Sequence, residues 1–95
     1  MDDMEINEAD ARKAFLNSFD FMRLGHAISC NNTQIAVMAA RGLEETARRV
    51  DLPDFERLLS SIRLAMISGN STEALDIMTQ LTARRVKLLN EADRG

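Results

Sequence analysis

The chain of 95 residues contains no tryptophan, no tyrosine, one cysteine, one proline and four glycines. A single cysteine excludes an internal disulfide, and with it the disulfide framework typical of small secreted domains. Four phenylalanines are the only aromatic residues, so methionine, leucine, isoleucine and alanine must fill most of the core. Because proline and glycine interrupt helices, their scarcity leaves few places where the chain can be divided into elements.

Long apolar runs are also missing, since no stretch approaches the roughly 20 residues that a helix needs to cross a bilayer. The first residues, Met1-Asp2-Asp3-Met4-Glu5, are acidic where a secretory signal would be basic. These features predict a cytoplasmic protein without a membrane partner. The net charge of −3 is unfavourable for a general polyanion binder, although most of the basic residues are arginines that could form a local basic face.

Apolar residues recur at helical spacing along nearly the whole chain, and no stretch alternates in the manner of a half-buried strand. The clearest case begins at Pro53, a residue that suits the first turn of a helix. Gly69 is expected to end this helix in the left-handed conformation of a C-terminal cap. Between them runs one continuous apolar stripe, which consists of Phe55, Leu58, Leu59, Ile62, Ala65 and Met66.

The segment after Gly69 predicts a corner between two helices. Asn70 or Ser71 can cap the next helix, and Glu73 could return the hydrogen bond as in a capping box. The competing interpretation, a phosphate-binding loop, would need more glycines and a nearby lysine. The next helix carries an apolar stripe of Ala74, Ile77, Met78, Leu81 and Leu88, with Leu75, Val86 and Leu89 on an adjoining line.

Gly69-Asn70 followed by Glu73-Ala74-Leu75 resembles the inter-helix corner of a tetratricopeptide-type hairpin, in which small residues let two helices pack closely. The resemblance covers about one hairpin. Ser61-Ile62 stands where that family prefers a Leu-Gly pair, and no proline closes the unit. No family assignment follows from this corner.

The first half of the chain predicts a helix near residues 7–30 that is apolar around much of its circumference. One face carries Phe15, Phe19, Met22 and His26, and the other carries residues such as Leu24. Such a helix is either central or shared with a second subunit. Asn31-Asn32-Thr33 predicts a break before the next helix, and the alternative is one long helix from about Asn7 to Val50.

The two halves also match weakly at an offset of 38 residues, as in Ala27 with Ala65 and Asn32 with Asn70. Duplication of one hairpin would produce this pattern. Because the matched residues are mostly alanine and aliphatic, two unrelated amphipathic hairpins would produce it as well.

Together these patterns predict an all-α antiparallel helical bundle of about four helices, arranged as two helical hairpins in a single domain over residues 1–95. A domain of this size gains little stability from its own core, so we expect a homodimer. After a flexible N-terminus at 1–6, helices are expected near residues 7–30, 33–50, 53–68 and 71–91.

His26 and Cys30 are the residues with the greatest potential for chemistry. They lie one helical turn apart, but no orienting third group accompanies them and no further histidine or cysteine exists. We therefore expect His26 to be a core or interface residue. The sequence predicts no catalytic residue, no metal ligand and no cofactor.

Arginines near the predicted helix C-termini are stabilised there by the helix dipole, which is a sufficient structural explanation. An alternative is a nucleic-acid-binding regulator that uses an arginine-rich face, but the acidic start of the last helix and the lack of aromatic stacking platforms oppose it. A second alternative is a small all-α enzyme acting on an anionic substrate, as in helical chorismate mutases, whose ordered charged positions cannot be matched here. The arginine-rich face of the nucleic-acid-binding alternative would consist of Arg41, Arg48, Arg84, Arg85 and Lys87.

The function best supported by the sequence is a non-enzymatic protein-binding module. It would act as a regulator, adaptor or chaperone that packs against a helix of a partner protein, besides forming a homodimer. The residues chosen for this interface lie at the edges of the main apolar stripes or outside them: Phe19, Phe21, Leu24, Ile28 and Met38.

Overall fold

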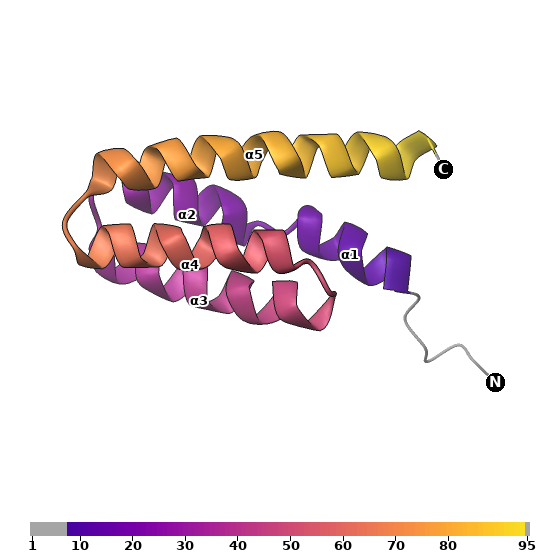
Figure 1. Cartoon of the computed structure of the whole chain (residues 1–95), viewed down its shortest axis with the longest axis horizontal. Helices are drawn as coiled ribbons and strands as arrows, with labels where there is room; N and C mark the ends of the chain where they lie inside the picture. The colour runs from indigo at the N-terminus through magenta and orange to yellow at the C-terminus, as the bar shows by residue number, and fades with distance from the viewer. Residues whose placement is uncertain (1–7, 95) are drawn as a thin grey trace.

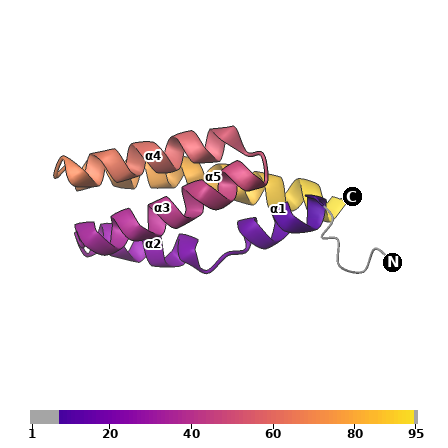
Figure 2. The same ribbon diagram turned by 90° about the horizontal axis from the view of Figure 1, so that it is seen from below.

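A computed structural model of the chain describes residues 8–94, which form five α-helices and no strand (Figures 1 and 2). The prediction of an all-helical chain is confirmed over these residues. The prediction of a flexible segment at 1–6 lies outside the described residues. The helices are α1 (Glu8–Leu16), α2 (Asp20–Ser29), α3 (Thr33–Arg49), α4 (Pro53–Ile67) and α5 (Ser71–Arg94).

Four of the helices, α2 to α5, pack around a common core. α2 contacts α3, α3 contacts α4, α4 contacts α5, and α5 contacts α2. α1 packs against α5 and α3. Figure 1 shows α5 along the length of the molecule, with the α4–α5 turn at one end and the α3–α4 turn towards the other. The largest fully buried side chains are Phe55, Leu24, Ile28, Leu43, Leu59, Ile62, Met66 and Leu81.

The helix predicted near residues 7–30 is wrong as a single element, because α1 ends at Leu16 and α2 begins at Asp20. In an uninterrupted helix, Phe15 and Phe21 would point about 120° apart around the axis. The break allows both rings to reach Phe55. The three ring centroids lie 5.2, 5.8 and 6.4 Å apart, and every pair meets edge to face.

Polar side chains form hydrogen bonds with the backbone at this break. The backbone N–H of Asp20 donates to Ser18 Oγ over 3.2 Å. From α5, the Arg85 guanidinium donates to the carbonyl of Leu16 and lies over the Phe21 ring, 5.2 Å from its centroid. Arg85 therefore ties the end of α1 and the start of α2 to α5.

The other three connections share one backbone geometry. Asn31, Asp51 and Gly69 have φ angles of 55°, 58° and 77°. The N–H of the following residue then donates to a buried alanine carbonyl: Asn32 to Ala27 at 2.8 Å, Leu52 to Ala47 at 2.9 Å and Asn70 to Ala65 at 2.8 Å. These are the bonds of the Schellman motif, which ends a helix by a left-handed residue. The predicted break at Asn31-Asn32 is confirmed, and the alternative of one helix from Asn7 to Val50 is wrong.

Two of the corners restart the chain with an asparagine cap. Asn32 Oδ1 accepts from the Ile35 N–H at 3.2 Å, and Asn70 Oδ1 accepts from the Glu73 N–H at 3.1 Å. The Glu73 carboxylate contacts the Asn70 side-chain amide at 3.0 Å, and the Asn70 backbone N–H is instead bonded to Ala65. The predicted cap at Asn70 is confirmed. The bond expected from the Glu73 carboxylate to the Asn70 backbone N–H is made to the Asn70 side-chain amide instead.

Candidate protein interface

Large apolar side chains remain exposed along one face, which is formed by α2 and α5. Phe19 and Met22 are 74% and 67% exposed, and Leu75 and Val86 on α5 are 42% and 47% exposed. An open groove runs between the two helices, and a cavity that adjoins it shares Met22 and Met78 and extends to Phe19. We call the groove together with Phe19 the α2–α5 face. The groove is lined by Met22, Gly25, His26, Ser29, Leu75, Met78, Thr79, Thr82, Ala83 and Val86.

Small side chains and Met78 are among the residues that line the groove. A methyl group added at Gly25 would lie 3.8 Å from Met78 Cε, so the two helices meet at this point without crowding. Both helices contribute small or short polar residues to the lining, Gly25 and Ser29 from α2 and Thr79, Thr82 and Ala83 from α5. No formally charged side chain lines it, and His26 is its only titratable residue. A partner could therefore cover the groove without burying an unpaired carboxylate, lysine or arginine, which would oppose binding.

The exposure of Phe19 follows from the break between α1 and α2. In a continuous helix Phe19 would lie one turn after Phe15, on the same side. Because the chain is redirected between them, Phe15 is buried in the aromatic cluster and Phe19 projects outward. The same local change that completes the core thus places an aromatic ring on the surface.

His26 and Cys30 meet at the end of α2, and both are exposed. Cys30 Sγ lies 3.6 Å from His26 Nε2, and the Cys30 N–H donates to the His26 carbonyl at 2.9 Å. His26 lines the groove, so it is not the core histidine that was one of the two expectations. Among residues 8–94, no group of three or more histidine, cysteine, aspartate or glutamate side chains could hold a metal ion.

Three of the five predicted interface residues lie in the core. Phe21, Leu24 and Ile28 are 3%, 0% and 1% exposed, so the expectation that they lie outside the main apolar stripes is wrong. The reason is that α2 directs this side towards α3 and the rest of the bundle. A partner could not contact these side chains without rearrangement of the chain.

Phe19 and Met38 are exposed, but they belong to different parts of the surface. Met38, 66% exposed, lies beside Ile35 at a separate cavity of about 200 Å³ between α2 and α3. The five predicted residues therefore do not form one surface, and their role in binding stays a prediction.

The sequence interpretation missed Met22, Leu75 and Val86. A signal for them existed, because Leu75 and Val86 form a second apolar line beside the core stripe of the last helix. A helix with two apolar lines buries one in its own core and leaves the other for a neighbour. Met22 lies on the same predicted face as Phe19, but only Phe19 was chosen from that face as an interface residue.

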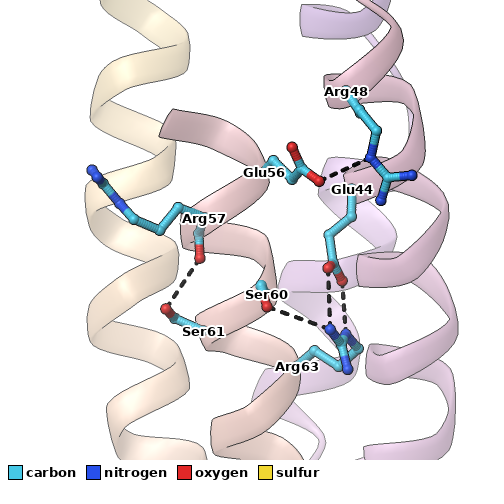
Figure 3. Close-up of polar contacts among 7 residues, drawn as sticks. All are labelled: Glu44, Arg48, Glu56, Arg57, Ser60, Ser61 and Arg63. Carbon is cyan, nitrogen blue, oxygen red and sulfur yellow. Dashed lines mark hydrogen bonds and ion pairs between the residues drawn. The ribbon is translucent and has the colours of Figure 1, made fainter. Parts of the chain in front are cut away.

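An enclosed ion pair joins α3 to α4 (Figure 3). Arg63 donates to both carboxylate oxygens of Glu44, through Nε at 2.8 Å and Nη2 at 3.2 Å, and a weaker bond reaches Ser60 Oγ at 3.4 Å. The hydrogen bond to Glu44 raises the pKa of Arg63, against the opposing effect of burial. Glu44 is the one charged side chain buried among the described residues. Because both partners are satisfied by each other, this pair has a structural role in joining two helices.

Several residues of the predicted basic face are engaged within the chain. Arg48 contacts Glu56 at 3.0 Å (Figure 3), Arg84 contacts Asp54 at 3.0 Å, and Arg85 donates to a backbone carbonyl. Arg84 also lines a cavity of about 280 Å³ at the start of α4, where Asp54 faces it. Neighbouring carboxylates reduce the positive potential that phosphates would require, so the geometry does not favour a nucleic-acid interface.

Comparison of the chain with protein-family models, with curated proteins and with solved structures found no match in any of the three. Within residues 8–94, none of the helices combines the length and the apolar character that crossing a membrane requires.

Proposed function

We propose that this chain is a non-enzymatic helical protein-binding module that associates through the α2–α5 face and serves as a regulator, adaptor or chaperone. In this proposal the chain forms two antiparallel helical hairpins, α2–α3 and α4–α5. The α2–α5 face is the exposed surface where the two hairpins meet. The observation that carries the proposal is the grouping of exposed Met22, Leu75 and Val86 around one uncharged groove, with exposed Phe19 at the adjoining cavity. A groove between two helices fits the apolar side of a third helix.

The amount of apolar surface sets the strength of such an interaction. Full burial of a large apolar side chain contributes about 1.5–3 kcal/mol. The four side chains are between 42% and 74% exposed, so covering them offers roughly 5 kcal/mol in total. The loss of translational and rotational freedom on association costs about 4–15 kcal/mol. The α2–α5 face alone therefore supports a weak and reversible complex, as suits a regulator that exchanges partners.

A second copy of the chain can supply the helix that fills the groove. In a two-fold symmetric pair, the same patch meets itself, so each α5 would present its line of Leu75 and Val86 to the other copy. We propose this homodimer as the form adopted in the absence of a partner. A helix of another protein with a matching apolar line would compete for the same groove.

The test is the molar mass in solution of three proteins, measured by light scattering and sedimentation over a wide concentration range. Val86→Glu places a charge in the groove, whereas Leu64→Glu places one at a similarly exposed apolar position on α4, away from the face. The wild-type chain and Leu64→Glu should exceed the monomer mass of 10.6 kDa as concentration rises, and Val86→Glu should not. Equal behaviour of the two variants would contradict the assignment of the face.

A further inference from the structure

The α2–α5 face carries a pair of metal-ligating side chains at its edge. His26 lines the groove, and Cys30 Sγ lies 3.6 Å from His26 Nε2. A tetrahedral Zn²⁺ with a sulfur ligand at about 2.3 Å and a nitrogen ligand at about 2.0–2.1 Å holds these two atoms roughly 3.5 Å apart. The separation observed here, which is that of a Cys30–His26 hydrogen bond, also matches the separation of two ligands on one zinc ion. The spacing of i and i+4 is also that of the two zinc-binding histidines of the H-E-x-x-H motif, although Cys30 is here the C-cap residue that follows α2.

Within one chain this pair is half of a site. A closed structural zinc site has four protein ligands, and His26 and Cys30 provide two. No third histidine, cysteine, aspartate or glutamate completes a cluster among residues 8–94. Both side chains are exposed, so a second chain could approach them from solvent.

We propose that two copies of this chain bind one Zn²⁺ between them, each through His26 Nε2 and Cys30 Sγ, at the edge of the α2–α5 face. This proposal rests on the self-association proposed above and names what holds the two copies together. A two-fold axis through the ion would bring the second pair into place and complete a Cys₂His₂ set. Each Cys30 thiol loses its proton to solvent on binding and each His26 binds as the neutral imidazole, so the two thiolates neutralise the ion.

The size of the face explains why a metal would be needed. From Leu75 to Val86 the groove runs about 17 Å along α5, and two helices side by side are roughly 20 Å wide. A stable protein–protein interface buries about 800 Å² on each partner, which exceeds a footprint of this size. An ion bound at the edge of the groove adds ligand bonds and fixes the orientation of the two copies, which a small apolar contact alone does not.

The test is a titration of the tag-free, fully reduced full-length chain with Zn²⁺ and, in parallel, with Co²⁺, whose visible spectrum reports tetrahedral coordination and thiolate ligation. The chain is held at a concentration where the metal-free form is monomeric. We expect saturation at one ion per two chains and a twofold rise in molar mass, from 10.6 kDa to about twice that value. A chelator should reverse both changes. Cys30→Ser and His26→Gln should each abolish the spectrum and the rise in mass, with helix content unchanged by circular dichroism.

The possible results separate this proposal from the proposed function. Saturation at one ion per chain without a rise in mass would overturn the shared site, as would retention of binding by both variants. No spectral change, together with concentration-dependent association of the metal-free chain, would overturn the zinc site and leave the α2–α5 interface standing. A chain that remains monomeric at all concentrations and with either metal would overturn both.

Discussion

At the scale of single residues, three left-handed positions determine where α2, α3 and α4 end. Asn31, Asp51 and Gly69 have positive φ angles, and each is followed by a residue whose N–H returns to a buried alanine carbonyl. Asparagine and aspartate tolerate this conformation better than other residues with a β-carbon, whereas glycine adopts it without strain. The residue type at each corner thus follows from the backbone geometry that the turn needs.

Replacement of Gly69 by valine should destabilise the chain by about 1–2 kcal/mol, because a β-branched residue resists the left-handed conformation. Nothing lies within 4 Å of the position that a β-carbon would take, so the effect would come from the backbone and not from a clash. Chemical denaturation of the wild type and the variant measures the difference.

Gly42 provides the matched control, because it lies inside α3 with open space around it. Alanine at this position should stabilise the chain by about 0.5–1 kcal/mol, since glycine is the weaker helix former. A Gly69→Val variant as stable as the wild type would show that the α4–α5 corner does not require its left-handed residue.

Residue-level signals located the corners on both sides of α4 from the sequence, whereas at Asn31-Asn32 they left one long helix as an alternative. Gly69, Asn70 and Pro53 have local preferences that do not depend on the rest of the chain, and the structure uses each as expected. The interface was harder to predict. Whether Leu24 or Met22 faces solvent depends on which side of the helix the bundle covers, and neither residue carries that information.

At the scale of helices, the break between α1 and α2 shows where local reasoning fails. Residues 17–19 are Asn-Ser-Phe, without the glycine or proline that commonly interrupts a helix. The break is favoured by a distant contact, because Phe15 and Phe21 can both reach Phe55 only when the helix axis is redirected. Tertiary packing therefore overrides the helical periodicity that predicted one element.

The Glu44–Arg63 pair gives a prediction for the contact between α3 and α4. Glu44→Met alone should destabilise the chain by about 1–3 kcal/mol, because it leaves Arg63 partly buried without its carboxylate. In the double variant Glu44→Met/Arg63→Met no uncompensated charge remains, and apolar side chains fill the same space. We expect its free energy of unfolding to lie closer to that of the wild type than that of the single variant does.

A double-mutant cycle measured by urea denaturation provides the readout, with Arg63→Met as the fourth member. Arg49 and Glu45, which form an ion pair on the exposed surface of α3, serve as a comparison. Their coupling should be a few tenths of a kcal/mol. Coupling between Glu44 and Arg63 no larger than this would show that the enclosed pair does not join the two helices energetically.

At the scale of the whole molecule, the sequence predicts a helix at residues 7–30 that is apolar on two sides, and the interface residues Phe19, Leu24 and Ile28 were chosen from both of them. The side with Leu24 and Ile28 enters the core, and the side with Phe19 and Met22 remains at the surface. Both sides have suitable periodicity, so the choice depends on the arrangement of α3 and α5 around α2. Only the assembled bundle distinguishes a core stripe from an interface stripe.

If the α2–α5 face joins two copies, the thermal stability of the chain must depend on its concentration. Unfolding of a dimer releases two chains, so the midpoint temperature rises with total protein, by at most about 5–10 °C for a hundredfold increase at this chain length. Calorimetry or circular dichroism at several concentrations should show this rise for the wild type and for Leu64→Glu. Val86→Glu should melt at a constant temperature close to that of the dilute wild type, because its charge prevents association while α5 remains helical. A midpoint that is independent of concentration in all three proteins would mean that the groove between α2 and α5 is not covered by a second copy.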